Sequence, residues 1–146
     1  MSSMTDSFEN ELIDFLLRGQ TYTPPATWYI GLLTAAPSDS AAGTEVTGGS
    51  YARVGVASSL VNWAGTQGAG TTVASTGTGG TTSNNAAITF PAPTANWGTA
   101  THFGFYTLST GGALKIYAAL TTPRIINSGD PAPKFNAADC TFQIDN

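Results

Sequence analysis

The segment Thr27–Thr34 constrains the fold more than any other part of the sequence, because it is rich in apolar residues, uncharged and bounded by prolines. Pro24 and Pro25 precede it and Pro37 follows it closely, so its length is set by turn residues as well as by composition. Apolar residues occupy odd and even positions of the segment alike. Because successive side chains of a strand point to opposite faces, both faces of this strand should be covered. The segment predicts a central strand in a two-layer β structure, and it contains no catalytic group.

Other short segments typical of strands recur along the chain, separated by turn residues. They are Tyr51–Val56, Ala86–Phe90, Thr99–Leu108, Ala113–Leu120 and Thr141–Ile144. The tight-turn signal in residues 109–112 predicts an antiparallel hairpin between the two strands that flank it. We therefore expect a mainly β fold, an antiparallel β-sandwich or flattened, jelly-roll-like barrel, with one N-terminal α-helix packed at its edge or end. The 146 residues suit one domain, with the helix in residues 1–19 and the β domain in residues 20–146.

Residues 6–18 predict that helix, with Asp6 as a possible N-cap, Glu9 in capping-box position and Gly19 at its end. At helical spacing its apolar side chains sweep an arc of roughly 200°, which is wider than one sheet face usually covers. Core packing explains most of this arc. The alternative is that the helix also contacts a neighbouring subunit, which makes Phe8, Leu12 and Leu16 candidate interface residues.

Charged residues make up only 10% of the chain, where an average globular domain has about 25%. A surface with so few charges is typical of a protein that works inside an assembly, and an ordinary extracellular β domain is the alternative. The net charge of −4 leaves no basic stripe, so direct nucleic-acid binding is not expected. No apolar run approaches the roughly 20 residues of a membrane span, and the first six residues do not have the pattern of a signal peptide. We expect a soluble protein that is made in a cytoplasm.

A long loop, Ala35–Ser50, follows the central strand and contains two carboxylates, Asp39 and Glu45. A calcium loop needs more oxygen ligands at short, regular spacing, so we do not expect a metal site. Arg53 is expected to hold this loop through Asp39 or Glu45, and a solvated side chain is the alternative. The loop is also expected to reach a partner in an assembly, which makes Asp39, Glu45 and Arg53 candidate interface residues.

The segment Ala64–Ser83 is low in complexity and contains neither a charge nor an aromatic ring. Part of it imitates the spacing of a phosphate-binding loop, but Thr71 stands where the phosphate-contacting lysine belongs. It cannot bury enough apolar area to offset its ordering entropy alone, so we expect an exposed, mobile or extended arm that orders on a partner. Its candidate contact residues are Gln67, Thr71 and Thr72.

The sequence lacks the residue sets that enzymes of common classes need. His102 is the only histidine, it falls inside an expected strand, and no G-x-S-x-G motif occurs. Cys140 is the only cysteine and is expected to be a small buried hydrophobe. We expect no catalytic activity and no cofactor. Aromatic side chains could form platforms for carbohydrate, or be consumed by the core: Trp28, Trp63, Trp97, Tyr22, Tyr51 and Tyr106.

The order of several short motifs resembles that of a family of small tailed-bacteriophage virion proteins, commonly labelled phage tail fibre proteins. The motifs lie in residues 36–39, 42–46, 48–54, 83–85, 88–90, 97–99 and 120–123. The similarity runs from about Trp28 to Ile144. It implies a virion component and carries over no catalytic residue.

Two functions are compatible with this resemblance. The first is a capsid decoration or cement protein that stabilises the head by bridging capsid subunits, which the small size favours. The alternative is a tail fibre or tail accessory protein involved in binding a host-surface glycan. The expected partners are the major capsid protein or tail proteins of the same virion, together with further copies of the chain, most simply as a homotrimer.

Overall fold

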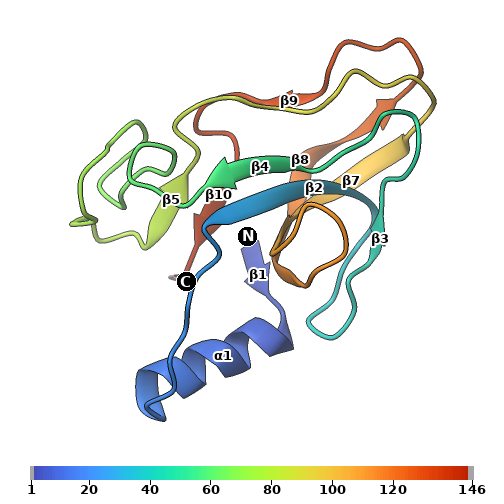
Figure 1. Cartoon of the computed structure of the whole chain (residues 1–146). Helices are drawn as coiled ribbons and strands as arrows, with labels where there is room; N and C mark the ends of the chain where they lie inside the picture. The colour runs from blue at the N-terminus through green and yellow to red at the C-terminus, as the bar shows by residue number, and fades with distance from the viewer. Residues whose placement is uncertain (1, 145–146) are drawn as a thin grey trace.

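The computed structural model describes residues 2–144 and shows a mainly β protein with one helix near the N-terminus (Figure 1). The elements in chain order are β1 (Ser2–Met4), α1 (Asp6–Leu17), β2 (Thr27–Ala35), β3 (Thr44–Glu45), β4 (Val54–Ala57), β5 (Thr81–Ser83), β6 (Ile88–Thr89), β7 (Gly98–Tyr106), β8 (Leu114–Ile126), β9 (Lys134–Phe135) and β10 (Thr141–Gln143).

Within the described residues, all strand pairs are antiparallel and form one large and two small sheets. The large sheet has the order β1-β8-β7-β2-β3, and β4 pairs with β2 beside β3. The pairs β5–β10 and β6–β9 form the two small sheets. One face of the large sheet packs against them around a core that includes Ile30, Phe105, Phe90 and Cys140. These unclosed sheets fit a sandwich, which confirms the expected fold class.

The strand β2 is internal to the large sheet, as the sequence predicts. It pairs with β7 on one side and with β3 and β4 on the other. Ile30 and Leu32 belong to the core, while Leu33 is fully buried and closes over Gly104 together with Leu114. Both faces of the strand are therefore covered.

The strands β3 and β4 pair with different parts of β2, so the Leu32 backbone, which lies between these parts, has no strand partner on that side. The Leu32 carbonyl accepts a hydrogen bond from Val46 N at 2.9 Å, and its N–H donates to the Tyr51 hydroxyl at 2.9 Å. The prediction that the strand begins at Tyr51 is wrong, because three consecutive residues with positive φ, Gly48 to Ser50, turn the chain before it and β4 begins at Val54.

The predicted hairpin between the long strands of the second half is confirmed as β7–β8. However, β8 continues six residues past the predicted end at Leu120. His102 is paired with Ala119 and Ala100 with Arg124, so residues 120–123 form an extra bulge in β8. Pro123 lies in this bulge. Because bulge residues are not paired with β7, the missing N–H of the proline removes no hydrogen bond between the two strands.

The helix α1 differs from its prediction at the start. Thr5, and not Asp6, is the N-cap residue, and its side chain makes no capping hydrogen bond. The Thr5 hydroxyl donates instead to the Leu114 carbonyl at 3.1 Å, because the preceding strand β1 pairs with β8 and brings it there. Gly19, with φ +69°, follows the end of the helix as expected. No helix in residues 2–144 is long and apolar enough to cross a membrane.

Candidate interaction surfaces

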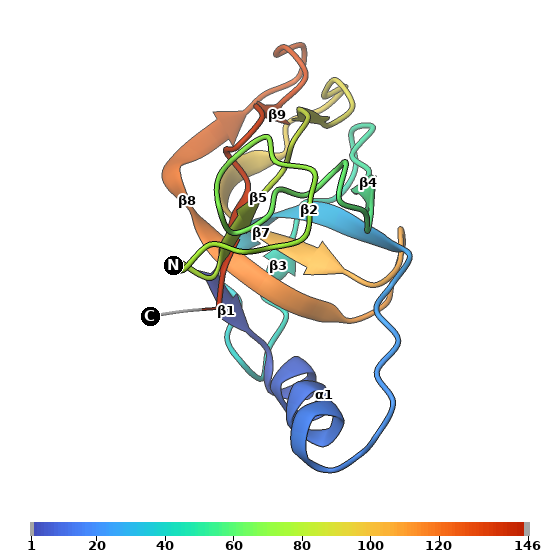
Figure 2. The same cartoon turned by 90° about the vertical axis from the view of Figure 1, so that its left-hand side faces the viewer.

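The helix α1 is held to the sheet by its N-terminal half. The Phe8 ring is buried, 5.9 Å from the Tyr22 ring centroid and 6.3 Å from that of Trp28. Lys115 of β8 donates from Nζ to Glu11 Oε1 at 2.6 Å and to Ser7 Oγ at 3.3 Å. Figure 2 shows the helix at one end of the molecule, projecting away from the sheets.

The C-terminal half of α1 presents an uncovered apolar face. Leu16 is 69% exposed and Leu17 is 83% exposed, and Ile13, three and four positions before them, is exposed on the same side of the helix. Phe15 is exposed as well, but it lies on the side of Phe8, and its ring centroid is 6.4 Å from that of Tyr22. Of the predicted interface residues, Phe8 lies in the core, Leu12 packs against it, and Leu16 is fully available for contact. The excess width of the apolar arc is therefore concentrated in Ile13, Leu16 and Leu17, of which Ile13 and Leu17 are absent from the predicted set.

An aromatic pocket of about 400 Å³ lies beside the helix, above the sheet face near Phe105 and Ile116. It brings together Tyr22, Trp28 and Trp63 from the predicted aromatic platforms. The Trp63 Nε1 atom is buried and has no hydrogen-bond partner within residues 2–144.

The other three aromatic residues predicted as possible carbohydrate platforms pack inside the protein. Trp97 is buried and its Nε1 donates to the Gly49 carbonyl at 2.9 Å. Tyr51 packs its ring between Phe90 and Trp97. Tyr106 is buried beneath the Arg53 guanidinium, whose central carbon lies 3.5 Å from the ring centroid.

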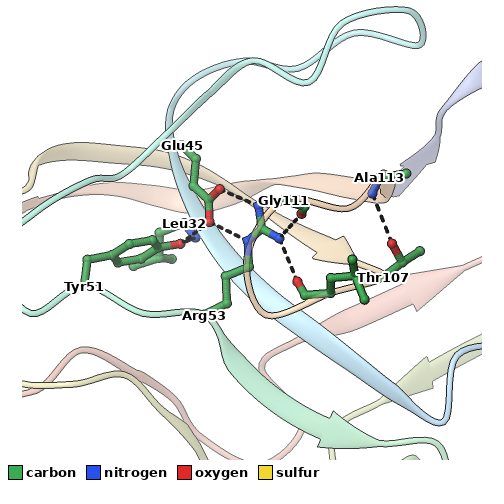
Figure 3. A network of polar contacts seen from close by, with 8 residues as sticks. Leu32, Glu45, Tyr51, Arg53, Thr107, Gly111 and Ala113 are labelled. Atoms are coloured by element: carbon green, nitrogen blue, oxygen red, sulfur yellow. Dashed lines mark hydrogen bonds and ion pairs between the residues drawn. The ribbon is translucent and has the colours of Figure 1, made fainter.

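Arg53 and Glu45 form a polar network at the edge of β2 (Figure 3). Arg53 donates from Nε to Glu45 Oε1 at 2.7 Å and from Nη2 to Oε2 at 2.6 Å, which is a bidentate ion pair. Its Nη1 donates to the carbonyls of Leu108 and Gly111 in the β7–β8 turn, at 2.7 and 2.6 Å. The Tyr51 hydroxyl donates to Glu45 Oε1 at 2.8 Å. The Arg53 side chain is only 7% exposed, so this network holds three loops together within the chain.

The surroundings of this network raise three pKa values. Burial, followed by the negative charge of Glu45, raises the pKa of the Tyr51 hydroxyl well above its usual range. The same two causes raise the pKa of Tyr106 to about 12, against an opposing effect of Arg53. Burial lowers the pKa of Arg53, but the hydrogen bonds and charge of Glu45 outweigh it, so that pKa is raised and the guanidinium stays charged.

Of the two partners predicted for Arg53, the structure selects Glu45 and places Asp39 elsewhere. Asp39 Oδ1 accepts a hydrogen bond from the Tyr117 hydroxyl at 2.7 Å, and the Asp39 carbonyl accepts one from Asp6 N at 2.9 Å. Asp39 therefore joins its loop to β8 and to the first residue of α1.

The segment 64–83 is exposed over most of its length but not extended, so that part of the prediction is wrong. It folds back on itself (Figures 1 and 2), since Gln67 donates to the Ala74 carbonyl at 3.2 Å and accepts from Thr76 N at 3.1 Å. The Thr71 hydroxyl accepts from Gly65 N and donates to the Gly68 carbonyl. Side-chain hydrogen bonds thus replace the apolar burial that the segment lacks, whereas Thr72 remains exposed.

The single histidine and the single cysteine both lie within the β structure. His102 is half-buried in β7, with Nδ1 2.9 Å from the Thr101 hydroxyl. Cys140 is fully buried as predicted, and burial followed by the charge of Asp139 raises its pKa to about 12. In residues 2–144, no group of three or more His, Cys, Asp or Glu side chains is arranged to hold a metal ion.

A buried residue that the sequence did not single out joins this part of the fold. The Asn84 side chain donates to the carbonyls of Ala86 and Asn136 at 2.7 and 2.8 Å, and its Oδ1 accepts from Cys140 N at 2.8 Å. Asn84 is 1% exposed. It therefore links β5 to the segment between β9 and β10.

Residues 3–143 match the family model described as podophage GP4 fiber I protein gp80. No curated protein matches the chain. The family match spans the helix as well as both layers of the sandwich. The protein belongs to this family, and it is a phage virion structural protein of fibre type.

Proposed function

We propose that this protein is a subunit of a tail fibre that self-associates through the exposed face of α1, formed by Ile13, Leu16 and Leu17. The observation that carries the proposal is this apolar face, which the chain leaves uncovered in a family of fibre proteins. The name of the family favours a tail location over the capsid decoration that the small size alone suggested. The proposed partners are further copies of the chain, most simply in a trimer, and other tail proteins of the same virion.

The charges around this face support an uncharged contact. Glu11 is paired with Lys115, and Asp14 with Arg18 at 2.9 Å. A neighbouring copy can therefore cover Leu16 and Leu17 without desolvating either of these carboxylates unpaired, which would be costly, while Glu9 is exposed one turn before Ile13, at the rim of the face. Exposed apolar side chains in one contiguous group are a common mark of a protein–protein interface.

A second copy is the occupant that this face fits best. A closed trimer repeats the same interface around its three-fold axis, so the apolar side chains of one helix can cover those of the next. A helix pair or a three-helix cluster packs such residues at axis distances of about 8–10 Å. Fibre assembly then needs no cofactor and no metal.

The location is tested on purified particles of the phage that encodes the protein. Quantitative gel densitometry gives the number of copies per particle, and immunogold electron microscopy gives their position. A tail fibre subunit is expected in tens of copies, with label at the tail. Hundreds of copies with label over the head would overturn the tail assignment in favour of capsid decoration.

A further inference from the structure

The five basic residues of the chain divide into two groups. Arg18, Arg53 and Lys115 are each paired with a carboxylate of the same chain. Arg124 of β8 and Lys134 of β9 are exposed, and their side chains make no hydrogen bond or ion pair within residues 2–144. A chain with so few charges therefore leaves two cations free, and both line the same small cavity.

This cavity has a volume of about 110 Å³ and lies between the end of β8 and β9. Its inner wall is apolar and includes the core residues Leu32, Phe90 and Ile126, and no carboxylate of the described chain lines it. The volume is below the range of about 300–1,000 Å³ that is usual for small-molecule sites. The cavity therefore suits one acidic side chain of a protein partner, with its stem against the apolar wall and its carboxylate beside the two cations.

Acidic side chains without a cationic partner gather at the start of α1. Asp6 and Glu9 are exposed and make no side-chain hydrogen bond or ion pair within the described part of the chain. Asp39 lies beside them, since its carbonyl accepts from Asp6 N at 2.9 Å. Burial, followed by the hydrogen bond and charge of Asp39 and then the charge of Glu9, raises the pKa of Tyr117 against an opposing hydrogen bond from Ser3. These carboxylates therefore lie around one point near the start of β8.

The two charged groups lie at opposite ends of the molecule. Figure 2 shows α1 at one end, and β9 with the end of β8 at the other. Tyr117 is near the start of β8 and Arg124 is near its end, so the strand itself joins the negative end to the positive end. We propose that the cavity between Arg124 and Lys134 receives the acidic first turn of α1 from a second copy of the chain, so that copies stack end to end.

Charge complementarity points to a second copy as the occupant. A contact between two different ends is heterologous and repeats without closing, which gives a linear stack. This contact rests on the proposed fibre and adds a direction of growth, because the α1 face closes only a ring of subunits. Exposed ion pairs strengthen association by a factor of only about two to five each. The contact therefore fixes the register of copies that are already held close together in a virion more than it supplies affinity.

The test uses the full-length protein at about 200 μM in about 20 mM sodium chloride, where weak contacts between charges are screened least. Small-angle X-ray scattering measures the maximum dimension and the weight-average mass. The wild type is expected to form elongated particles whose mass rises with protein concentration. In about 0.5 M sodium chloride the mass should fall to that of the oligomer held by α1 alone.

Charge exchange between the two ends identifies the contact. Arg124→Glu/Lys134→Glu makes both ends negative, and Asp6→Lys/Glu9→Lys makes both ends positive. Neither variant should stack alone, whereas an equimolar mixture of the two, or one variant with all four substitutions, should stack as the wild type does. Net charge alone predicts the opposite for the second variant, since its formal net charge moves from −4 to about 0 and its copies would repel one another least.

Neutral substitutions cover the case in which lysine in the first turn of α1 disturbs the helix. Asp6→Asn/Glu9→Gln and Arg124→Gln/Lys134→Gln remove two charges each without reversing them, and either should weaken stacking about fourfold or more. Far-UV circular dichroism checks that the fold is kept.

The control for net charge is Thr72→Glu/Val73→Glu, which adds two negative charges at exposed positions of the segment 64–83. It changes the net charge by as much as Arg124→Gln/Lys134→Gln does, but it should alter stacking by less than about twofold.

Three results would overturn the proposed contact: a wild type whose mass does not rise at low salt, a variant with two like ends that stacks alone, or a mixture of the two variants that stays unstacked. The outcome is distinct from that of the α1 interface. A salt-resistant trimer that never stacks would refute the end-to-end contact and leave the α1 interface intact. A chain that is monomeric at micromolar concentration but stacks at low salt would do the reverse.

Discussion

Arg53 connects three loops that are far apart in the sequence. One edge of its guanidinium donates to the Glu45 carboxylate, and the Nη1 atom donates to two carbonyls of the β7–β8 turn. The face of the guanidinium lies over the Tyr106 ring. Lysine cannot reproduce this arrangement, because its ammonium is a single point of charge without a planar fork.

Replacing this residue should therefore destabilise the fold strongly. We expect Arg53→Ala to lower the free energy of unfolding by about 3 kcal/mol, since it leaves Glu45 without its partner, and Arg53→Lys to lower it by about 1–2 kcal/mol. Urea denaturation measures both. Arg18→Ala is the matched control, because the Arg18–Asp14 pair is exposed and should contribute less than about 0.5 kcal/mol. Equal effects of Arg53→Ala and Arg18→Ala would show that the network has no special role in stability.

The raised pKa values predict a loss of stability at high pH. The pKa values of Tyr51, Tyr106 and Cys140 are raised in the folded state, so the unfolded chain releases these protons at lower pH than the folded chain. Their contribution is complete below about pH 8 and should fall as pH rises from about 9 through 12, by about 1 kcal/mol per group and pH unit.

Urea denaturation between pH 7 and 12 measures this loss. Cys140→Ala should delay its start from about pH 9 to about pH 10, where unfolded tyrosine ionises. A free energy of unfolding that stays constant or rises over this range would contradict the prediction.

Sequence reasoning identified Arg53 with two possible partners, but it gave no role to Tyr51 in hydrogen bonding and did not find Asn84. The Arg53 hypothesis was possible because an arginine is rare in this chain and an acidic loop lies nearby. Asn84 bonds to residues 52 and 56 positions away, and a local pattern contains no information on such distant partners. In the sequence, asparagine before a small-residue run is typical of a turn.

At the scale of elements, the long strands were predictable, and of the short ones only β4, β6 and β10 overlapped predicted strands. The strands β2, β7 and β8 have enough β-branched and aromatic residues for their composition to identify them. The strands β3 and β9 contain two residues each, which is too short for an alternation pattern. The strand β6 lies within the predicted strand Ala86–Phe90, but only two of those residues pair. The strand β5 lies within the low-complexity segment and forms because β10, from the end of the chain, pairs with it.

The helix α1 gives the sharpest test of self-association. Leu16→Asp/Leu17→Asp places two charges on the exposed apolar face and should convert the oligomer to monomers, as measured by sedimentation velocity at micromolar concentration. Because both side chains are largely exposed, each substitution should change the free energy of unfolding by less than about 0.5 kcal/mol. Leu12 is left unchanged, since it packs against the core.

Val73→Asp is the control for this experiment, because Val73 is another exposed apolar residue, in the segment 64–83. It should leave the oligomer intact. A wild-type protein that is monomeric both in solution and in the particle, or an oligomer that survives the double substitution, would rule out the α1 face as the interface.

At the scale of the whole molecule, the sequence predicted the class of fold but not where its surfaces would be open. A cavity of about 530 Å³ draws residues from β5, β7, β8, β9 and β10, and one of its walls includes part of the bulge at residues 120–123. Pro123 was visible in the sequence, but the register of β8 on either side of it was not. The two cavities arise because several separate segments meet, so neither could be read from one segment.

The low charge of the chain predicts how its assembly should respond to salt. Raising the ionic strength from about 0.1 to 1 M shortens the Debye length from about 10 to 3 Å and weakens association that depends on charge. The proposed α1 interface is apolar and its neighbouring carboxylates, Glu11 and Asp14, are already paired within the chain. Sedimentation equilibrium in low and high sodium chloride should therefore give association constants that agree within about threefold, a difference of about 0.6 kcal/mol. Because burial of apolar surface drives the contact, association should also carry a negative heat-capacity change in calorimetry. An oligomer that dissociates in high salt would show instead that charged groups outside α1 hold it together.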